Sequence, residues 1–460
     1  MSPIDDFIAD LGAIAYSVDP ATLNRKSRDN AAVSPILRKS LGGRRAEVVV
    51  RPVSKEEIAT VTRAAVRHRL PLTARGGGTA NYGQSVPSNG GVLVDMTGFA
   101  GVCAVREGSV RARAGTLMLD IDTALRAHGR ELLIHPSTTA TATIAGFIAG
   151  GSGGIGSASW GQLRDRGNIT AVEVMSAEAE PRLVELTGQA VALVHHAWGT
   201  NGLITEVEMP TGPAWTWHEC LVAFADFMTA ARFAIQLARE CGLIKKLISL
   251  QEWPLPSLMK DLAGTAPEGH ALVNCYIAEA SMPAFCDLVA DCGGRIVADH
   301  RSGQNPFGAP LYEFAWGHGL RQLQKTDPGF TNFQGMFPGD RLLQSLSAVH
   351  AALAGRHPLR LEFFRSQGDV VAMGSHVFVY ESDAQMRRMV EFLQGFGVSI
   401  ANSHTTGVRE VGIKQFTAED LPFKQRMDPH GLFNPGKLDF ADVVAKNLPT
   451  TGWSFEQARS

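Results

Sequence analysis

The glycines of this 460-residue chain gather in a few short clusters in its first half. Of 48 glycines, many fall within Gly76–Gly78, Gly90–Gly91, Gly146–Gly161 and Gly199–Gly202. Glycine adopts positive φ angles freely, and it lets another molecule approach the backbone closely. The clusters therefore predict stretches of backbone that turn sharply or lie against a bound molecule.

The composition is that of a globular protein with a large core, with 45% hydrophobic and 19% charged residues. At about 150 residues per domain, the length predicts roughly three compact units or two large ones. A net charge of −2 argues against a general binder of nucleic acid or anionic membranes. No apolar run reaches the roughly 18 residues of a membrane-spanning helix, and the N-terminus lacks the basic flank of a secretory signal. We therefore expect a cytoplasmic protein with no integral membrane segment.

Strands and helices alternate in the pattern before residue 213. A helix is expected after Ser54, which forms a capping box with Glu57, and another after Thr116, ending at Gly129. The pattern predicts strands at 47–52, 71–74, 91–95, 109–114, 169–175 and 203–209. The second of these strands runs directly into a glycine loop, an order of elements typical of nucleotide sites.

After Pro213 a strand–helix theme repeats three times. Strands are predicted at 221–225, 271–277, 295–298 and 370–380, and helices after Asp226, after Ser281 and over 383–395. Such units predict an α+β cap built on an antiparallel sheet. The C-terminal tail is again rich in Gly and Pro, like the first part of the chain. The cap is therefore predicted to be an insertion into the first domain. The predicted parts are 1–213, 214–399 and 400–460.

The segment Gly151–Gly156 matches GxGxxG, and Glu173 lies roughly 20 residues further on, as in dinucleotide-binding folds. That motif needs a strand before it and a long regular helix after it. The following stretch instead carries further glycines and no apolar helical stripe. A dinucleotide fold is therefore not favoured, and glycines that only turn the chain remain an alternative.

Four segments taken together explain the glycines better. Consecutive unhindered N–H groups from Arg75 to Thr79 suit an anionic pyrophosphate. Small and hydroxylated residues elsewhere let a flat ring and its phosphates approach the backbone. The cofactor-contacting residues expected are Arg75, Gly76, Gly77, Gly78, Thr79, Pro136, Ser137, Thr138, Thr143, Ile144, Gly146, Gly150, Ser152, Gly153, Gly202, Ile204, Asn434 and Lys437.

These segments resemble the vanillyl-alcohol-oxidase/p-cresol-methylhydroxylase-type FAD flavoproteins, above all the branch of the glycolate-oxidase and D-lactate-dehydrogenase FAD subunits. The resemblance rests on Arg75–Thr79, Thr143–Gly154, Gly202–Thr205 and Asp428–Lys437. It implies a two-subdomain, PCMH-type FAD-binding domain of N- and C-terminal pieces with an inserted cap. It also implies oxidation of a hydroxyl-bearing small molecule, foremost a 2-hydroxy acid, by hydride transfer to flavin N5, with an unknown electron acceptor.

Two departures from the family pattern affect cofactor and metal. Members with covalent flavin often carry a histidine where this chain has Thr79, so the resemblance implies FAD held non-covalently. Metal-dependent members carry a Gly-Asp-Gly-Asn core and a Glu-His pair, whereas this chain reads Gly374-Ser375-His376 and Ser403-His404 at those places. No metal is expected, although Glu362, His376 and His404 keep that alternative open.

The reaction needs a base that takes the hydroxyl proton, and histidine is the usual one near neutral pH. His404 lies, by the resemblance, near the family's active-site histidine and is the leading candidate. His318 in an aromatic cluster is the second. Arg321 is a candidate to hold a carboxylate bidentately, and Tyr312 a candidate phenolic base. For His318, Arg321 and Tyr312, ordinary packing or a solvated position remains the alternative. Glu362 is expected to form an ion pair with Arg365.

Two other functions stay open. A chain of alkylglycerone-phosphate-synthase type would need a phosphate-binding basic cluster in the cap, of which Lys245-Lys246 gives a faint sign. A non-catalytic flavin subunit of a multi-component dehydrogenase would bind FAD without being reduced by hydroxy acids. A homo-oligomer is a further possibility.

Overall fold

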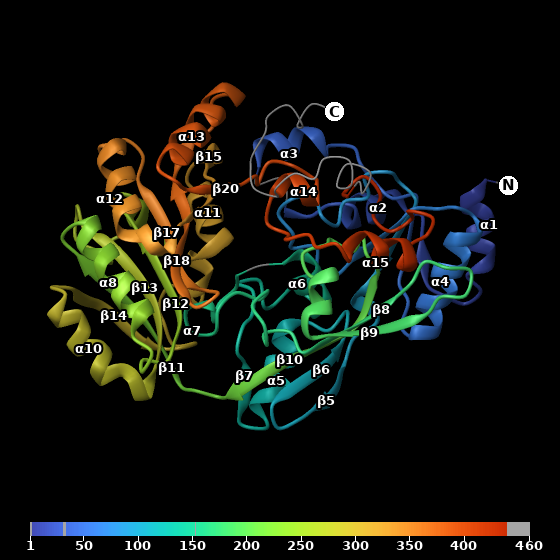
Figure 1. The fold of residues 1–460 in the computed structure, drawn as a ribbon, viewed down its shortest axis with the longest axis horizontal. Coiled ribbons are helices and arrows are strands. Elements are labelled where there is room, and N and C mark those ends of the chain that lie inside the picture. Colours follow the sequence, from blue (N-terminus) through green and yellow to red (C-terminus); the bar gives the residue numbers. More distant parts are fainter. Residues whose placement is uncertain (1, 31–33, 152, 439–460) are drawn as a thin grey trace. The chain divides into compact units, whose positions relative to one another are not determined.

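The computed structural model describes residues 2–30, 34–151 and 153–438, which form two compact units (Figure 1). The first unit contains residues 1–152, 166–213 and 403–460, and the second contains 153–165 and 214–402. The second unit is therefore an insertion in the chain of the first, with one additional short segment taken from it.

The first unit contains two sheets with helices around them. Its helices are α1 (Pro3–Asp10), α2 (Pro20–Lys26), α3 (Pro35–Ser40), α4 (Lys55–Arg67), α5 (Met118–Arg126), α6 (Ile144–Gly150), α14 (Val408–Val411) and α15 (Asp420–Met427). Its strands are β1 (Tyr16–Ser17), β2 (Val48–Val50), β3 (Leu72–Arg75), β4 (Val92–Asp95), β5 (Val102–Val105), β6 (Ser109–Arg113), β7 (Arg130–Leu132), β8 (Ala171–Met175), β9 (Leu183–Thr187) and β10 (Leu203–Pro213).

The first sheet has the order β1-β2-β4-β3, with β2, β4 and β3 parallel. The valines of β2 and the residues Val92–Asp95 of β4 are all buried. Strands buried on both faces read as continuous apolar runs, which is why these strands could be predicted from the sequence. Helix α4 buries Ile58, Val61 and Ala65 at helical spacing.

The second sheet is antiparallel and has the order β5-β6-β10-β8-β9, with β7 paired to β10. Strand β10 alternates buried residues with Glu206 and Glu208. These carboxylates pair with Lys55, Arg106 and Arg111. One face of β10 therefore packs on the core while the other carries an ion-pair network.

The second unit is built on an eight-stranded antiparallel sheet of order β14-β11-β13-β12-β17-β18-β16-β20. Its strands are β11 (Trp217–Phe224), β12 (Lys245–Gln251), β13 (Ala271–Ala278), β14 (Arg295–Arg301), β15 (Phe330–Thr331), β16 (Gln334–Phe337), β17 (Leu359–Ser366), β18 (Asp369–His376), β19 (Phe378–Val379) and β20 (Ser399–Ala401). Its helices are α7 (Ser157–Trp160), α8 (Phe227–Arg239), α9 (Leu255–Leu258), α10 (Met282–Asp291), α11 (Trp316–Gln324), α12 (Leu342–Leu353) and α13 (Asp383–Gly395), with a 3₁₀ turn at Leu311–Phe314.

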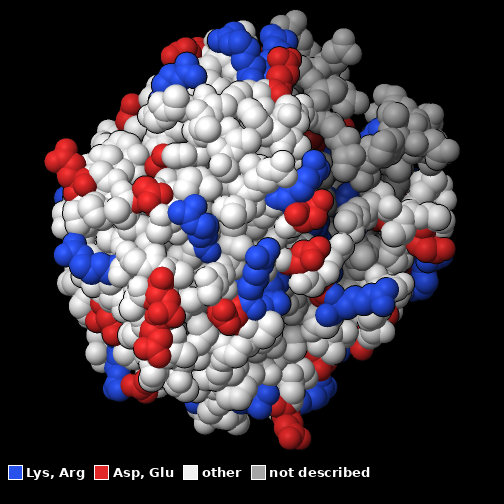
Figure 2. All heavy atoms as spheres, turned by 60° about the vertical axis from the view of Figure 1, so that its left-hand side comes forward, with Lys and Arg blue, Asp and Glu red and all other residues white. Residues whose placement is uncertain are grey.

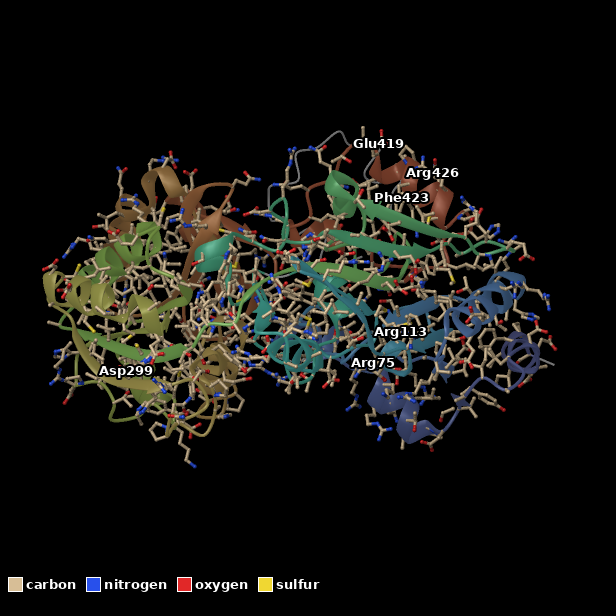
Figure 3. All side chains as sticks on the ribbon, turned by 90° about the horizontal axis from the view of Figure 1, so that it is seen from below. Arg75, Arg113, Asp299, Glu419, Phe423 and Arg426 are labelled. Atoms are coloured by element: carbon tan, nitrogen blue, oxygen red, sulfur yellow. The ribbon has the colours of Figure 1, made fainter. Side chains whose placement is uncertain are left out.

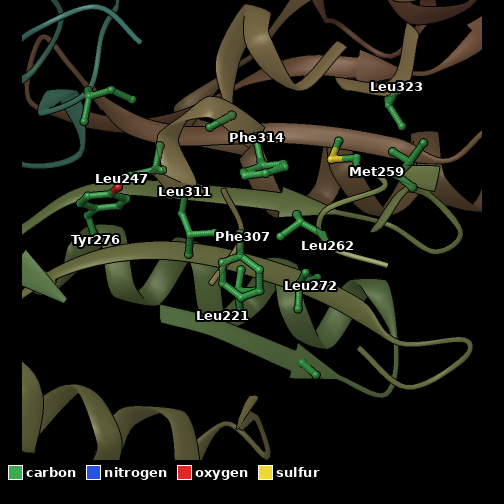
Figure 4. Close-up of a cluster of buried hydrophobic side chains, with 14 of the residues drawn as sticks. Leu221, Leu247, Met259, Leu262, Leu272, Tyr276, Phe307, Leu311, Phe314 and Leu323 are labelled. Atoms are coloured by element: carbon green, nitrogen blue, oxygen red, sulfur yellow. The ribbon is translucent and has the colours of Figure 1, made fainter. Parts of the chain in front are cut away.

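The two faces of this sheet have different neighbours. Phe224 of β11 faces helix α8, where its ring lies 4.9 Å from that of Phe233. On the other face Leu221 and Tyr276 pack with Leu311 and Phe314 of the 3₁₀ turn (Figure 4). This second face carries the aromatic segment that the sequence analysis singled out.

The α+β prediction and the antiparallel cap sheet are confirmed, and the predicted strands all correspond to observed ones within a few residues. Thr116 does not cap helix α5: Leu117 precedes the helix, and the Thr116 hydroxyl donates to Arg113 O at 2.7 Å. The capping box at α4 is only half formed. Ser54 accepts from Glu57 N, but the Glu57 carboxylate accepts from Val53 N instead of Ser54 N.

The unit boundaries differ in detail from the predicted parts. Residues 153–165 group with the second unit, because Gly156 N donates to Lys246 O and Ser159 Oγ to Lys245 O. Residues 400 and 401 also belong there, since β20 pairs with β16. The GxGxxG segment follows helix α6 and leads into the four-residue α7, which is not the geometry of a dinucleotide fold.

Basic and acidic side chains are interspersed over the face of the molecule shown in Figure 2. Among the residues that the structure describes, no helix is both long and apolar enough to span a bilayer.

Candidate functional site

The glycine loop after β3 packs directly against the segment that precedes helix α6. A Cβ on Gly76 would lie 2.0 Å from Thr143 Oγ1, and one on Gly77 would lie 1.7 Å from Thr141 O. Any side chain at these positions would push the two segments apart. Within the described residues, the backbone N–H groups from Gly76 to Thr79 make no hydrogen bond. Four consecutive unused donors are suited to an anion.

Arg75 lies at the end of β3 (Figure 3) and folds back over the loop. A Cβ on Gly78, whose φ is +70°, would lie 1.7 Å from the Arg75 guanidinium. That guanidinium donates to Arg28 O at 3.0 Å, and burial lowers its pKa against the opposing effects of Asp95 and Asp29. The loop therefore carries a partly desolvated positive charge beside its free N–H groups.

A turn from Thr138 to Ala142 positions the partner segment. Thr138 O accepts from the N–H groups of Thr141 and Ala142, while Met118 N donates to Ala142 O. Leu117 and Thr143 form a bridge, and Thr143 caps α6 by accepting from Gly146 N. Pro136 is buried, and Ser137 and Thr138 are partly exposed. The start of α5 thus fixes the segment that the glycine loop rests on.

The end of helix α6 lies against the segment before β10. His196 N donates to Ile148 O and Trp198 N donates to Ala149 O. A Cβ on Gly151 would lie 2.2 Å from His196 Nδ1, so glycine is required there. His196 is buried and serves this packing.

Asn434 bonds to three separate segments of the first unit. Its Nδ2 donates to Gln84 O at 2.8 Å and to Trp198 O at 2.7 Å, and its N–H donates to Leu72 O at 2.7 Å. Both amide hydrogens are therefore used within the protein. The C-terminal motif ties the glycine loop region to the segment before β10.

Lys437 is 1% exposed, and within the described residues its ammonium has no hydrogen-bond partner. Burial lowers its pKa to about 8, although Asp29 opposes this shift. The same Asp29 carboxylate, together with Asp95, opposes the lowering of the Arg75 pKa by burial. Lys437 and Arg75 therefore share one carboxylate, from opposite ends of the chain.

The remaining predicted cofactor residues are spread over both units. Gly202 has a φ of +139° and packs on Val174 and Met427, and Ile204 is buried in β10. Gly150 belongs to the first unit and Gly153 to the second. Ser152 lies outside the described residues.

His404, the leading base candidate, is 5% exposed and belongs to the first unit. Its Nδ1 lies 2.8 Å from Ser34 Oγ. Because Ser34 Oγ already accepts from Leu37 N, its own hydrogen is available for Nδ1. This contact fixes the orientation of the imidazole, and it is compatible with either tautomer of the neutral ring.

The other three catalytic candidates belong to the second unit and lie close together in sequence. His318 Nδ1 contacts the Glu313 carboxylate, and the His318 side chain is 14% exposed. The ring of Tyr312 lies 5.9 Å from that of Tyr276 on the sheet. Arg321 is on the same helix, α11, as His318. The contact with Glu313 fixes the orientation of the His318 ring.

The expected pair between Glu362 and Arg365 is wrong. Glu362 instead pairs with Arg360 at 2.9 Å, and both side chains are 5% exposed. Arg365 donates to the carbonyl oxygens of Ala238 and Arg239. Burial raises the pKa of Glu362 to about 7, with Arg360 opposing. Residues 360 and 362 are two apart on β17, and alternate residues of a strand lie on the same face of the sheet. This spacing is the signal from which the pair could have been predicted.

Residues 46–183 match the family model described as an FAD binding domain. The chain carries an FAD-binding domain. The glycolate oxidase subunit GlcD of Escherichia coli K12 is 23% identical over 429 residues, covering 88% of this chain and 84% of that protein. A D-lactate dehydrogenase of Archaeoglobus fulgidus is 26% identical over 171 residues, or 36% of this chain and 38% of that protein.

Solved structures agree on the fold. A structure of alkyldihydroxyacetonephosphate synthase matches with a TM-score of 0.70 at 15% identity, over 93% of this chain and 85% of that one. At this identity the match establishes the architecture alone. The FAD-binding domain and the sequence relatives make the chain an FAD-dependent oxidoreductase.

The residues of the first unit fit FAD. The N–H groups of the glycine loop, unbonded within the described residues, the partly buried Arg75 and the buried Lys437 are the donors that a pyrophosphate requires. Thr79 stands at the position discussed for covalent attachment, and non-covalent binding stays a prediction. Over the described ranges no group of three or more metal-ligating side chains comes together.

Proposed function

We propose that this protein oxidises the CH–OH group of a small 2-hydroxy acid. The observation that carries the proposal is the relationship to GlcD, which extends over both units and not only over the FAD-binding domain. The D-lactate dehydrogenase and a D-2-hydroxyglutarate dehydrogenase of Pseudomonas putida, 32% identical over 155 residues, act on the same class of compound.

The proposal assigns separate roles to the residues of this chain. Gly76–Thr79, Arg75 and Lys437 hold the cofactor, which when bound accepts the hydride from the substrate carbon. Arg321 binds the substrate carboxylate, because a guanidinium matches a carboxylate with two parallel hydrogen bonds. His404 takes the hydroxyl proton on Nδ1 or Nε2, and His318, paired with Glu313, is the second candidate.

The alternative of alkylglycerone-phosphate-synthase type gains no support from the cap lysines. Lys245 is 1% exposed, and its Nζ donates to Glu240 O and Leu243 O at the end of helix α8. Lys246 lies 4.8 Å above the Trp217 ring. Both lysines are thus engaged within the fold and do not form a phosphate site.

The test is anaerobic mixing of the FAD-loaded protein with glycolate, D-lactate, L-lactate and D-2-hydroxyglutarate in turn. Bleaching of the visible flavin bands by at least one acid is the expected result. Photoreduction of the same sample controls for a competent flavin. A flavin that photoreduces but is bleached by none of the acids would overturn the proposal and favour the non-catalytic subunit.

Replacement of Arg321 separates substrate binding from flavin binding. Arg321→Met is expected to raise KM for the acid by roughly 100-fold, since a charged bidentate contact is worth about 3 kcal/mol. FAD content should be unchanged. Arg341→Met, an exposed arginine of the same unit, is the matched control.

A further inference from the structure

Buried polar side chains on one face of the second-unit sheet bond to the backbone of residues 303–316. Glu219 accepts from Gly303 N and Leu311 N, and Asn274 donates to Leu311 O. Gln251 donates to Phe314 O at 2.9 Å. Each of these side chains is fully buried. The segment is therefore fixed at successive points by side chains from β11, β13 and β12, with its apolar side chains filling the space between (Figure 4).

The last point of attachment is Trp316, where both the backbone N–H group and the carbonyl oxygen are hydrogen-bonded. Trp316 N donates to Glu362 Oε1 at 2.7 Å, and the Arg360 guanidinium donates to Trp316 O. Arg360 and Glu362 also bond to one another, and Ser249 Oγ donates to Glu362 Oε1 at 3.0 Å. An ion pair with both partners buried thus holds a single peptide position.

Trp316 needs this support because its φ is +49°. A left-handed backbone is unfavourable for any residue with a Cβ, and a bulky aromatic residue adopts it only where surrounding contacts impose it. Such strained positions concentrate at functional sites. A buried ion pair is by itself a weak source of stability, so its role here is better sought in the geometry it imposes.

That geometry places the Trp316 indole on the glycine-rich segment. A Cβ on Gly153 would lie 2.4 Å from Trp316 Cη2, and the indole ring lies 5.4 Å from the Phe364 ring on β17. Gly153 is one of the residues expected to contact the cofactor. The indole consequently lies where it can fix the position of that segment.

We propose that Arg360 and Glu362 are positioning residues that hold Trp316 in its left-handed conformation, so that its indole sets the cofactor-binding position of the segment at Gly153. This rests on the proposed assignment of Gly153 to the FAD site. Without the pair, Trp316 relaxes, and only a fraction of molecules then carries the segment in the binding position, which weakens the apparent affinity for FAD.

The experiment is titration of the deflavinated full-length protein with FAD, followed by the visible flavin spectrum and by quenching of tryptophan fluorescence. Glu362→Gln is expected to weaken FAD binding about tenfold, the size of effect that a left-handed residue represents. The decisive comparison uses Trp316→Gly, because glycine adopts positive φ without the pair. In that background Glu362→Gln should change FAD affinity by less than about twofold. Equal losses in both backgrounds would show a merely structural pair and overturn the proposal.

A second pair of variants does not depend on Glu362. Gly153→Ala is expected to weaken FAD binding because its Cβ meets the indole, and adding Trp316→Gly should restore affinity toward that of Trp316→Gly alone. A Gly153→Ala loss that Trp316→Gly does not relieve would contradict the contact. Ser249→Ala, which removes one bond to Glu362 without touching Trp316, is the matched control. No hydroxy acid is used, so failure of the substrate proposal leaves this result readable.

Discussion

The candidate site residues of the two units differ in kind, backbone groups in the first unit and side chains in the second. In the first unit the site is backbone: free N–H groups from Gly76 to Thr79 and glycines that let segments touch. In the second unit it is side chains, since Glu219, Gln251 and Glu362 reach from strands to hold the segment that carries His318 and Arg321.

This difference fits the roles that we propose for the two units, cofactor binding for the first and substrate binding for the second. A pyrophosphate is recognised by backbone N–H groups that any sequence offers once side chains are absent. A small substrate is recognised by particular side chains, which must be held rigidly by a second set.

The largest expected effect concerns the buried pair of the second unit. Arg360→Leu leaves Glu362 buried without its partner, and we expect a loss of about 3–5 kcal/mol in the free energy of unfolding at pH 8. Urea denaturation measures it. The control is Arg301→Leu, which breaks the exposed pair with Glu279 and should cost less than about 0.5 kcal/mol. Equal losses in both variants would remove the distinction between the two kinds of pair.

The corresponding change in the first unit is steric. Gly77→Val places a Cβ 1.7 Å from Thr141 O, so the backbone must move. We expect this displacement to cost about 3 kcal/mol of binding free energy, which weakens FAD binding roughly 100-fold. FAD content after purification and fluorescence titration measure this. Gly108→Ala, where a Cβ meets nothing within 4 Å, should bind FAD normally. A Gly77→Val protein with full FAD affinity would refute the backbone-built site.

A pH effect is expected from His376, which is fully buried and whose pKa burial lowers to about 3. Below its ordinary pKa near 6.5 the unfolded chain binds the proton and the folded chain does not, so stability falls as pH falls. Between pH 7 and 5 the loss should be about 2 kcal/mol. Between the same pH values, the free energy of unfolding of His376→Phe should fall by about 2 kcal/mol less than that of the wild type. Urea denaturation at both pH values measures this difference. His128→Phe, at an exposed position, should leave the pH dependence as it is.

The smallest effect tests the charge of the first unit. Lys437→Met is expected to weaken FAD binding roughly tenfold at pH 7, because it removes a charge-assisted contact. Since the pKa of Lys437 is about 8, wild-type affinity should fall as pH rises from 8 to 10, and the variant should show no such fall. Titrations at several pH values measure both. Parallel pH curves would show that Lys437 does not meet the phosphates.

Much of the fold could be predicted from the sequence, and less of the second-unit site. Ser54, Asp226 and the valines of β2 and β4 act through neighbours a few residues away, and the predictions built on them hold apart from half of one capping box. Thr116 was misread because its hydroxyl is used by a turn, a competition that the local pattern does not reveal. The expected pair between Glu362 and Arg365 overlooked that residues 360 and 362 share one face of β17, which brings Arg360 to Glu362.

The sequence by itself indicated a loop suited to a pyrophosphate, because consecutive N–H groups around the glycines are a local feature. Its contiguous motifs also carried the resemblance to the FAD flavoproteins, and that resemblance implied the cofactor. The tertiary structure decided that Asn434 serves the fold with both amide hydrogens, that Gly153 lies under Trp316, and that Glu362 holds Trp316 rather than Arg365. Those facts depend on strand register and on contacts across 46 to more than 200 residues, which only the folded chain brings together.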